Sequence, residues 1–510
     1  MFVQKLYRYT MAPLLNLIAV TVRINESTIL KNIDFIVQQG QHWAIIGPSG
    51  AGKTALLHTI TGKLPINSGQ IKRYFADEYL QAAPHNGTAH TFHDLLAITS
   101  PQHTFKNKSN VQSFYYQQRF NSTDAEEADT VIDYLKAVKT PIQAYWTVDK
   151  VVSLLDLSSL LNKTIIKLSN GETRRLTIAL ALLRNPKLLL MDQPLIGLDI
   201  GTRARFNQIL QQIIDSGIHL IITTPANEIP AVATHVAYLA NGEIKIAGKK
   251  TSVIASTSFP LQAQLPTFQN IEMLQQELAS YALPAFQKII EMKGVNVRYG
   301  DKPILTDINW DVIQGERWAI KGHNGAGKST LLSLINGDNP QAYANHIVLF
   351  DRRRGSGESI WEIKKKIGFV SPEQHQYFPT EQTCLQTILS GFFDTDGLFR
   401  KTSKEQEEIA LRWMEIFGIK HIIAKRLKTV PTSEQRLCLL ARALIKKPVL
   451  LILDEPCQGL SPEQRDLFKS VVNELCLHSV VTILYVSHYA EDIPSLINQT
   501  LLLEKGYRIN

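Results

Sequence analysis

The sequence predicts an α/β protein made of two tandem domains of the same fold, each built around a mostly parallel β-sheet. Three observations support this fold class. The same landmarks occur twice, in the same order, along the 510 residues. Apolar runs of strand length alternate with helical patterns, which is typical of βαβ units. The runs LLLMD and LLILD are apolar throughout, as strands buried on both faces of a sheet should be.

The repeat begins with a lead segment, TILKNIDFIVQQGQHWAI in the first half and PILTDINWDVIQGERWAI in the second. A glycine-rich loop follows each lead, GPSGAGKT at residues 47–54 and GHNGAGKS at residues 322–329. Later come NPKLLLMDQP, which ends at Pro194, and KPVLLILDEP, which ends at Pro456. Each half then has one more apolar run, HLIITT or TILYVS, so both halves are expected to contain the same series of strands.

These landmarks define the expected domain organisation. We predict a first domain over residues 12–252 and a second domain over residues 286–510. The linker between them, over residues 253–285, contains three prolines and one short amphipathic stretch, which predicts a single helix.

Composition and charge limit the functional classes. Hydrophobic residues make up 44% and charged residues 20%, which is ordinary for a globular protein and argues against long disorder or a fibrous coil. Lys and Arg total 54 against 46 Asp and Glu, so the net charge of +8 permits contact with phosphates or an anionic membrane face without requiring it.

The location of the protein is also suggested by its sequence. There is no uncharged apolar run of about 18 residues, so we expect no transmembrane segment. The first residues, with Lys5 and Arg8, look like a short arm and not a signal peptide. Four cysteines in the second half, without CxxC spacing, argue against a zinc site or disulfide framework. We predict a cytoplasmic protein, with peripheral association at the inner face of the membrane as an alternative.

The two glycine loops follow the pattern GxxxxGK[ST], which binds phosphates through backbone N–H groups and a helix N-terminus. Lys53 and Lys328 are expected to reach β- and γ-phosphate oxygens, and Thr54 and Ser329 to bind Mg²⁺. The predicted nucleotide-binding residues are Gly47, Pro48, Ser49, Gly50, Ala51, Gly52, Lys53 and Thr54 in the first loop, and Gly322, His323, Asn324, Gly325, Ala326, Gly327, Lys328, Ser329 and Thr330 in the second.

The two halves differ where the chemistry is expected. Asp192 and Asp454 each end an apolar strand, where a carboxylate can orient the water shell of Mg²⁺. Glu455 follows in the second half, but Gln193 follows in the first. A carboxylate can polarise an attacking water and a neutral amide cannot, so hydrolysis is predicted for the second half.

A histidine after the last apolar run adds to this difference. His488 follows TILYVS in the second half, while the first half has Thr224 at the compared position. An imidazole there can donate to the γ-phosphate and hold the neighbouring Glu455. The predicted catalytic residues are therefore Glu455, His488 and Lys328, and the predicted metal-binding residues include Thr54, Asp192, Ser329 and Asp454.

These motifs resemble those of the ATP-binding cassette (ABC) ATPases, a family of P-loop NTPases. The resemblance implies a helical subdomain in each domain, ATP and Mg²⁺ as ligands, and ATP hydrolysis as the activity. It also implies a signature, LSGGQ, that contacts the ATP of the partner domain. The first half has LSNGE at residues 168–172, which implies that Ser169 and Gly171 contact the γ-phosphate. The second half has VPTSE at residues 430–434, which lacks both glycines and has Pro431 in place of the serine.

The family pairs its two cassettes head to tail, so each ATP lies between one phosphate loop and the other domain's signature. In this chain the second phosphate loop, Glu455, His488 and LSNGE would form one complete site. The first phosphate loop, Gln193, Thr224 and VPTSE would form the other. Departures from both halves thus fall in one site. The resemblance implies that the cassettes pair within the chain, with one hydrolytic site and one that holds ATP without efficient turnover.

Two further positions follow from the resemblance. The family stacks adenine on an aromatic side chain near its first strand pair, which implies Tyr299 in the second half, where the first half has Ile24. The family also places a glutamine near a strand end, in contact with Mg²⁺ and the partner permease. This implies Gln102 and Gln374, each displaced by one or two residues beside a proline.

Nearly the whole chain resembles tandem-cassette proteins described as molybdate-transport or photorepair ATP-binding proteins, through LSNGETRR, LYVSHYAEDIP and the stretch from GAGKSTLL to KKKIGFVS. This implies an energy-coupling subunit that works with a separate membrane permease at its cytoplasmic face. Ribose- and galactose-type importers, which also fuse two cassettes, are a rival interpretation. The alternative class is a soluble, non-transport ATPase that acts on a ribosome, nucleic acid or protein complex. The short linker and the lost signature disfavour the translation-associated branch.

Two basic segments bear on the nucleic-acid alternative. Residues 352–358, RRRGSGE, and residues 106–120, KNKSNVQSFYYQQRF, combine cations with glycines or aromatics. We interpret the first as a solvated hairpin tip and the second as part of a helical subdomain.

Overall fold

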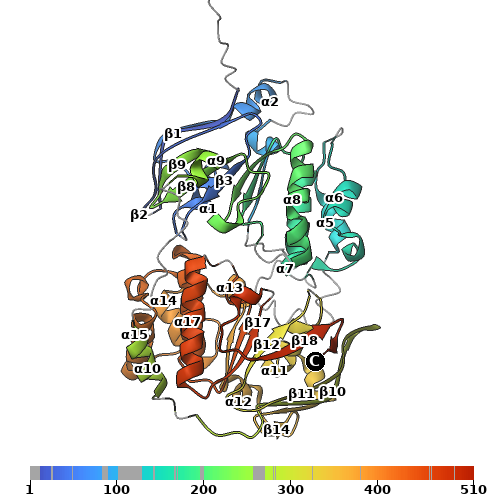
Figure 1. Cartoon of the computed structure of the whole chain (residues 1–510), viewed down its shortest axis with the longest axis vertical. Coiled ribbons are helices and arrows are strands. Elements are labelled where there is room, and N and C mark those ends of the chain that lie inside the picture. The colour runs from blue at the N-terminus through green and yellow to red at the C-terminus, as the bar shows by residue number, and fades with distance from the viewer. Residues whose placement is uncertain are drawn as a thin grey trace, which may run out of the picture. The chain divides into compact units, whose positions relative to one another are not determined.

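The protein is described here by a computed structural model, in which the chain forms two compact units. The first unit takes the described residues up to 256, and the second takes those from 270 onward. In Figure 1 the chain runs from blue to green through the first unit and from yellow-green to red through the second. The structure describes residues 12–24, 27–48, 50–82, 90–100, 129–141, 144–165, 168, 170–195, 200–256, 270–279, 281, 283–323, 325–379, 381–458, 460, 462–487 and 489–509.

The core of the first unit is a six-stranded sheet with the order β5-β6-β7-β3-β8-β9. Its first five strands run parallel and β9 pairs antiparallel with β8. The crossovers that parallel strands need are long, and they place helices against the sheet. The strands are β3 (Trp43–Ile46), β5 (Leu96–Thr99), β6 (Leu188–Asp192), β7 (His219–Thr223), β8 (His235–Ala240) and β9 (Glu243–Lys249).

A three-stranded antiparallel sheet, β2-β1-β4, forms a second layer of this unit. Its strands are β1 (Pro13–Ile24), β2 (Ser27–Gln38) and β4 (Ser68–Lys72). Within this unit Figure 1 shows β1 and β2 on one side of the parallel sheet, with α7 and α8 on the other and α5 and α6 beyond them. The α-helices among its described residues are α1 (Lys53–Ile60), α2 (Asp77–Gln81), α5 (Val131–Ala137), α6 (Val148–Leu154), α7 (Asn170–Leu183), α8 (Ile200–Asp215) and α9 (Lys250–Ile254).

The second unit repeats this design. Its six-stranded sheet has the order β15-β16-β17-β12-β18-β19, again parallel except for the last strand, and its antiparallel sheet has the order β11-β10-β13-β14. The strands are β10 (Ile290–Tyr299), β11 (Lys302–Val312), β12 (Arg317–Lys321), β13 (His346–Leu349), β14 (Arg352–Arg353), β15 (Ile367–Val370), β16 (Leu450–Asp454), β17 (Thr482–Val486), β18 (Gln499–Glu504) and β19 (Tyr507–Arg508).

Helices of the second unit cover the sheet and form a separate cluster beside it. The helix that follows β12 is α11 (Lys328–Asn336), as α1 follows β3 in the first unit. The cluster consists of α14, α15 and α16, which contact one another. The remaining bounds are α10 (Ile271–Ala279), α12 (Ile360–Lys364), α13 (Pro372–Tyr377), α14 (Cys384–Leu389), α15 (Lys404–Ile416), α16 (Thr432–Leu444) and α17 (Pro462–His478).

The central strands are the most buried part of each unit. All five side chains of β6 and all five of β16 are buried, as the apolar runs LLLMD and LLILD predict. The fold class is therefore confirmed, including the mostly parallel sheet and the helical cluster. The antiparallel sheets were not predicted. In each one a hairpin, β1–β2 or β10–β11, pairs with a third strand, β4 or β13, that lies far along the chain.

The helix in the predicted linker packs within the second unit. Leu274 and Leu278 of α10 are 0% and 1% exposed and belong to the hydrophobic core there. Gln275 donates to Glu474 of α17 at 3.1 Å, and Arg412 of α15 forms an ion pair with Glu277 at 3.2 Å. The second half of the predicted linker is thus part of the second unit.

The arginine run at residues 352–358 forms a compact turn. Arg352 and Arg353 are exposed, as a hairpin tip predicts, but Arg354 is buried. The Arg354 guanidinium pairs with Glu358 at 2.9 Å and lies over the ring of Tyr343. Residues 106–120 lie outside the described part of the chain. Among the described residues, no helix has the length and apolar character needed to span a bilayer.

Candidate nucleotide-binding sites

The predicted site residues gather at one edge of each parallel sheet. In the first unit, residue 45 of β3 and Asp192 of β6 are both register partners of Thr223, so β7 lies between them. In the second unit, Ile320 of β12 and Asp454 of β16 both pair with Val486 of β17. The carboxyl ends of these strands therefore present the glycine loop and the aspartate side by side, as expected of ligand sites in open α/β sheets.

The glycine loops of the two units have the same backbone shape. Gly52 and Gly327 precede the first helical residue with φ values of 102° and 103°, which favour glycine. A Cβ atom on Gly47 would lie 2.0 Å from the Leu239 carbonyl oxygen, and one on Gly322 would lie 2.4 Å from that of Leu503. Gly47 and Gly322 are thus needed because the backbone of each loop packs closely against a neighbouring strand, β8 or β18. Ser49 and Asn324 lie outside the described residues.

The two lysines of the loops are buried and bend back over them. Lys53 donates to the Gly47 carbonyl at 2.6 Å, and Lys328 donates to the Gly322 carbonyl at 2.7 Å. Burial lowers the pKa of Lys328, while the nearby Glu455 and Asp454 carboxylates oppose that shift. The structure therefore brings Lys328, Asp454 and Glu455 together in the second unit.

In the first unit Asp192 is held by two hydroxyl groups. Thr54 donates to Oδ2 at 2.8 Å, and Thr223 donates to Oδ1. The buried Arg174 guanidinium also interacts with this carboxylate, and burial lowers the pKa of Arg174 to about 10. Thr54 and Asp192 thus meet as two Mg²⁺ ligands should. Sequence reasoning missed Thr223, although a polar residue in HLIIT, where the second unit has Val486, was a visible signal.

The residues after the two aspartates occupy the same unusual backbone position. Gln193 and Glu455 have φ values of 45° and 44°, in the left-handed region. The backbone N–H of Gln193 donates to the Thr223 carbonyl at 3.1 Å, and that of Glu455 donates to the Val486 carbonyl at 2.9 Å. The two positions therefore differ mainly in side-chain chemistry, an amide in the first unit and a carboxylate in the second.

Strand register changes one comparison between the halves. Since Thr223 corresponds to Val486, the residue two places later is Pro225 in the first unit and His488 in the second, so Thr224 corresponds to Ser487 instead. The Thr224 hydroxyl donates to the Glu228 carbonyl at 3.0 Å. The Pro225 side chain has no hydrogen-bond donor, so the first unit lacks an imidazole at the position that corresponds to His488. His488 itself lies outside the described residues.

The two signature segments both lead into a helix. Gly171 lies buried in the first turn of α7, and Lys163 pairs with Glu172 beside it at 2.6 Å. In the second unit α16 begins at Thr432, with Pro431 as its N-cap residue. Pro431 has no backbone N–H to offer a phosphate. Ser169 lies outside the described residues.

Tyr299 and Gln374 are placed differently. Tyr299 is the last residue of β10 and is 37% exposed, so part of its ring is accessible. Gln374 lies within α13, four residues past β15. In the amide orientation that gives both atoms partners, it donates to the Phe369 carbonyl at 2.9 Å and accepts from Arg442 at 2.8 Å. These partners do not include the predicted metal-binding residues, so its assignment as a metal ligand stays an unsupported prediction. Gln102 lies outside the described residues.

The family assignment comes from comparison with known proteins. The sequence profile described as "ABC transporter" matches residues 30–196 and 305–458, which include both glycine loops and both strand-end aspartates. The chain belongs to the ABC transporter family of ATP-binding proteins. It carries two ABC cassettes in tandem, and proteins of this family bind ATP and are generally ATPases.

Two relatives with the same tandem organisation align with nearly the whole of this chain. ABC transporter ATP-binding protein ModF of Escherichia coli K12 is 34% identical, over 94% of this chain and 95% of ModF. An uncharacterized ABC transporter ATP-binding protein of Schizosaccharomyces pombe, C323.04, is 31% identical, over 94% of this chain and 95% of its own. Among solved structures, cbiO1 of Clostridium perfringens, part of the ABC transporter complex cbiONQ, shares 24% identity. It covers 44% of this chain and 88% of its own, with a TM-score of 0.39.

Proposed function

We propose that this protein hydrolyses ATP at the phosphate loop of its second cassette and holds ATP without efficient turnover at that of its first. The observation that carries the proposal is the pair Glu455 and Gln193, which share one backbone geometry but differ in whether a carboxylate is present. Only the carboxylate can polarise an attacking water. Glu455 accepts from the Gln458 side chain at 3.1 Å, which orients it.

The surrounding residues fit Mg²⁺-ATP. The loop N–H groups and the α11 N-terminus suit phosphate oxygens, and Lys328 suits the charge of the γ-phosphate. Ser329 is exposed at the start of α11, and its hydroxyl and the Asp454 carboxylate would supply oxygen donors of the kind Mg²⁺ prefers, as the Thr54–Asp192 pair would in the first unit. Mg²⁺ would neutralise phosphate charge. His488 is proposed to be a second hydrogen-bond donor to the γ-phosphate, besides Lys328.

The competent site is proposed to be composite. Ser169 and the backbone at Gly171 of the first cassette would complete it, since LSNGE retains a glycine at the start of a helix. The corresponding segment of the second cassette begins its helix after Pro431 and offers one donor fewer. Defects of the first phosphate site and of the second signature then belong to the same composite site.

The proposed biological role is energy coupling in transport. The relatives that span both cassettes bear names of ABC transporter ATP-binding proteins, and one of them is ModF. We assign this chain the same class of role, with a separate membrane permease at the cytoplasmic side and molybdate as the first substrate to examine.

Steady-state ATP turnover of single variants tests the site assignment. Glu455→Gln is expected to reduce turnover at least about tenfold, because it removes the water-polarising carboxylate and keeps the side-chain volume. The matched test adds Gln193→Glu to the Glu455→Gln protein, which should stay inactive. The first phosphate loop is proposed to pair with the VPTSE segment, which lacks the signature glycines. If Glu455→Gln keeps full turnover while Lys53→Ala abolishes it, the competent site has been assigned to the wrong cassette.

A further inference from the structure

A short polar chain connects Tyr299 to the helix that follows the second phosphate loop. The side-chain nitrogen of Asn339 donates to the Tyr299 hydroxyl at 3.0 Å and to the Ser333 hydroxyl at 3.2 Å. Ser333 lies in α11, which begins at Lys328 of the phosphate loop. The nucleobase platform implied for the second cassette is therefore linked through one buried amide to the helix that carries its phosphate site.

The Asn339 amide has only one satisfactory orientation. Asn339 is 1% exposed, and its side-chain oxygen accepts from the backbone N–H of Gln341 at 3.0 Å. This bond turns the nitrogen, with its two N–H groups, toward Ser333 and Tyr299. Gln341 in turn bonds both backbone groups of Arg298, the residue before Tyr299, at 3.1 and 2.8 Å. Gln341 thus holds both the Asn339 side chain and the backbone of the residue that precedes Tyr299.

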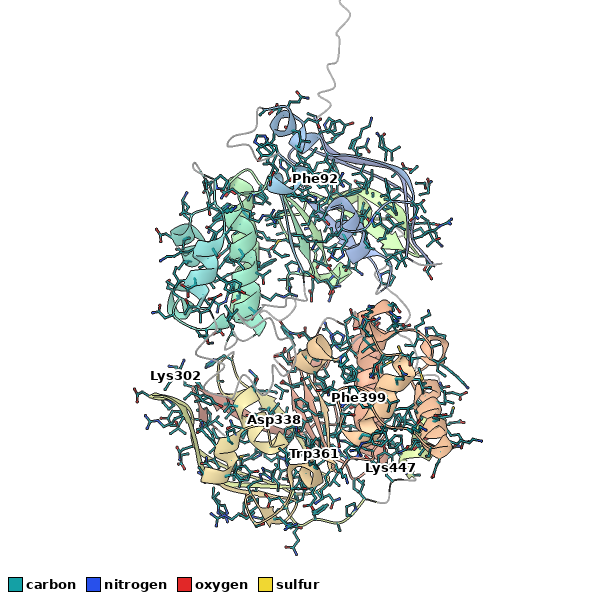
Figure 2. The ribbon with its side chains drawn as sticks, turned by 180° about the vertical axis from the view of Figure 1, so that it is seen from behind. Phe92, Lys302, Asp338, Trp361, Phe399 and Lys447 are labelled. Atoms are coloured by element: carbon teal, nitrogen blue, oxygen red, sulfur yellow. The ribbon has the colours of Figure 1, made fainter. Side chains whose placement is uncertain are left out.

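The first cassette has the same backbone but lacks this link. Leu64 donates its backbone N–H to the His58 carbonyl at 3.2 Å, as Asn339 does to the Ser333 carbonyl at 3.2 Å. Ile24 pairs with Ser27 as Tyr299 pairs with Lys302. Both polar partners of the second cassette are therefore apolar in the first, Ile24 for Tyr299 and Leu64 for Asn339. Lys302 and Asp338, the residue before Asn339, are labelled in the second unit in Figure 2.

We propose that Asn339 is a positioning residue that fixes the Tyr299 ring for stacking on the purine base of the nucleotide in the second cassette. The inference rests on the proposed function, since it assigns the ring to that site. Tyr299 ends a strand and is 37% exposed. The bond from Asn339 restricts its ring beforehand, which reduces the conformational freedom lost when a base stacks on it. The first cassette, without ring or tether, contributes no such preference for a base.

Binding of two probes separates positioning from a general structural role. The full-length protein, with Lys53→Ala in all variants to weaken the first site, is titrated with Mg²⁺-ATP and with Mg²⁺-tripolyphosphate, which has no base. Asn339→Leu should weaken ATP binding about two- to tenfold and leave tripolyphosphate binding unchanged. Tyr299→Phe, which keeps the ring and removes the hydroxyl, should have the same effect. The double variant should bind ATP no more weakly than either single variant.

Asn345→Ala is the matched control. Asn345 also joins β10 to the segment after α11, through bonds with Asn296 at 2.8 and 3.0 Å and with the Gln341 carbonyl at 2.9 Å, but its side chain bonds neither Tyr299 nor Asn339. It should leave both affinities unchanged. Equal loss of both probes in Asn339→Leu would overturn the proposal, because the phosphate loop would then be disturbed. Unchanged ATP affinity in Asn339→Leu, with a loss in Tyr299→Ala, would overturn the positioning role alone. Unchanged ATP affinity in Tyr299→Ala would remove the platform itself, and with it the assignment of Tyr299 under the proposed function.

Discussion

At the scale of single residues, the two cassettes differ by side chains placed on the same backbone. The left-handed residue after the strand-end aspartate is an amide in one unit and a carboxylate in the other. Each donates its backbone N–H to the carbonyl of the neighbouring strand, and that of Gln193 also donates to the Thr223 hydroxyl at 2.9 Å. The first unit adds the Thr223 hydroxyl, which occupies one oxygen of Asp192, where the second unit has Val486. The asymmetry therefore requires no change of fold, only of a few polar groups at strand ends.

The sequence motifs indicated the glycine loops, the strand-end aspartates and the Glu455–Gln193 difference, because these depend on local patterns. Thr223, Arg174 and Asn339 were not predicted, since each acts through a partner far away in the sequence. Gln374 was suggested by proximity to a strand end, but the helix α13 turns its side chain toward Phe369 and Arg442. A local sequence pattern predicts where a strand ends, but it does not predict in which direction the side chains of the following helix point.

A buried histidine of the second unit gives a pH prediction. Burial and the nearby Arg436 lower the pKa of His375 to about 3, although its bond to Gln435 at 2.7 Å opposes the shift. Between pH 6.5 and 3 the unfolded chain binds a proton that the folded chain excludes, so stability falls as pH falls. His375 should remove about 2 kcal/mol of unfolding free energy between pH 7 and pH 5. In denaturant unfolding of the second unit, the loss of unfolding free energy between pH 7 and pH 5 should be smaller in His375→Gln, by about 2 kcal/mol. Parallel pH profiles of the two proteins would contradict the prediction.

At the scale of elements, the helix α10 shows how tertiary contacts decide the role of a segment. Its sequence predicted a short helix between domains, and nothing local indicated which domain it would join. The structure buries its apolar face against α15 and α17 and adds side-chain bonds on both sides. The parallel strands, by contrast, were readable from five-residue apolar runs, because burial on both faces leaves a local signal.

The contribution of α10 to stability can be tested by truncating two aliphatic side chains of similar size in this helix. Leu274 is 0% exposed and Ile271 is 37% exposed on the same helix. Leu274→Ala should lower the unfolding free energy of the second unit by about 2–5 kcal/mol, since it leaves a cavity in the core. Ile271→Ala should cost less than about 1 kcal/mol. Similar effects of the two substitutions in denaturant unfolding would show that α10 does not stabilise the second unit.

At the scale of the whole molecule, two cassettes of one family occur in a single chain. The tandem arrangement was visible in the sequence as a repeat, and the profile match confirms it. The membrane permease proposed as partner was implied by the resemblance alone, because docking surfaces on a cassette carry no motif as specific as a phosphate loop.

A trapped complex would identify that partner. Glu455→Gln protein is supplied with Mg²⁺-ATP, which should hold the cassettes closed, then cross-linked in cells and analysed by mass spectrometry. We expect a polytopic membrane protein among the captured chains. The control is the same variant with Lys328→Ala, which should lose the capture because γ-phosphate binding is weakened. Ribosomal or nucleic-acid-associated proteins in place of a membrane protein would contradict the transport role and support a non-transport ATPase.

The docking of α10 also has a kinetic consequence. It leaves only residues 257–269 between the last described residue of the first unit and the first described residue of the second. Because both cassettes belong to one chain, their encounter is a unimolecular event, governed by an effective concentration that dilution cannot lower. The proposed closure should therefore proceed at the same rate at nanomolar and micromolar protein, unlike the closure of cassettes that meet as separate chains.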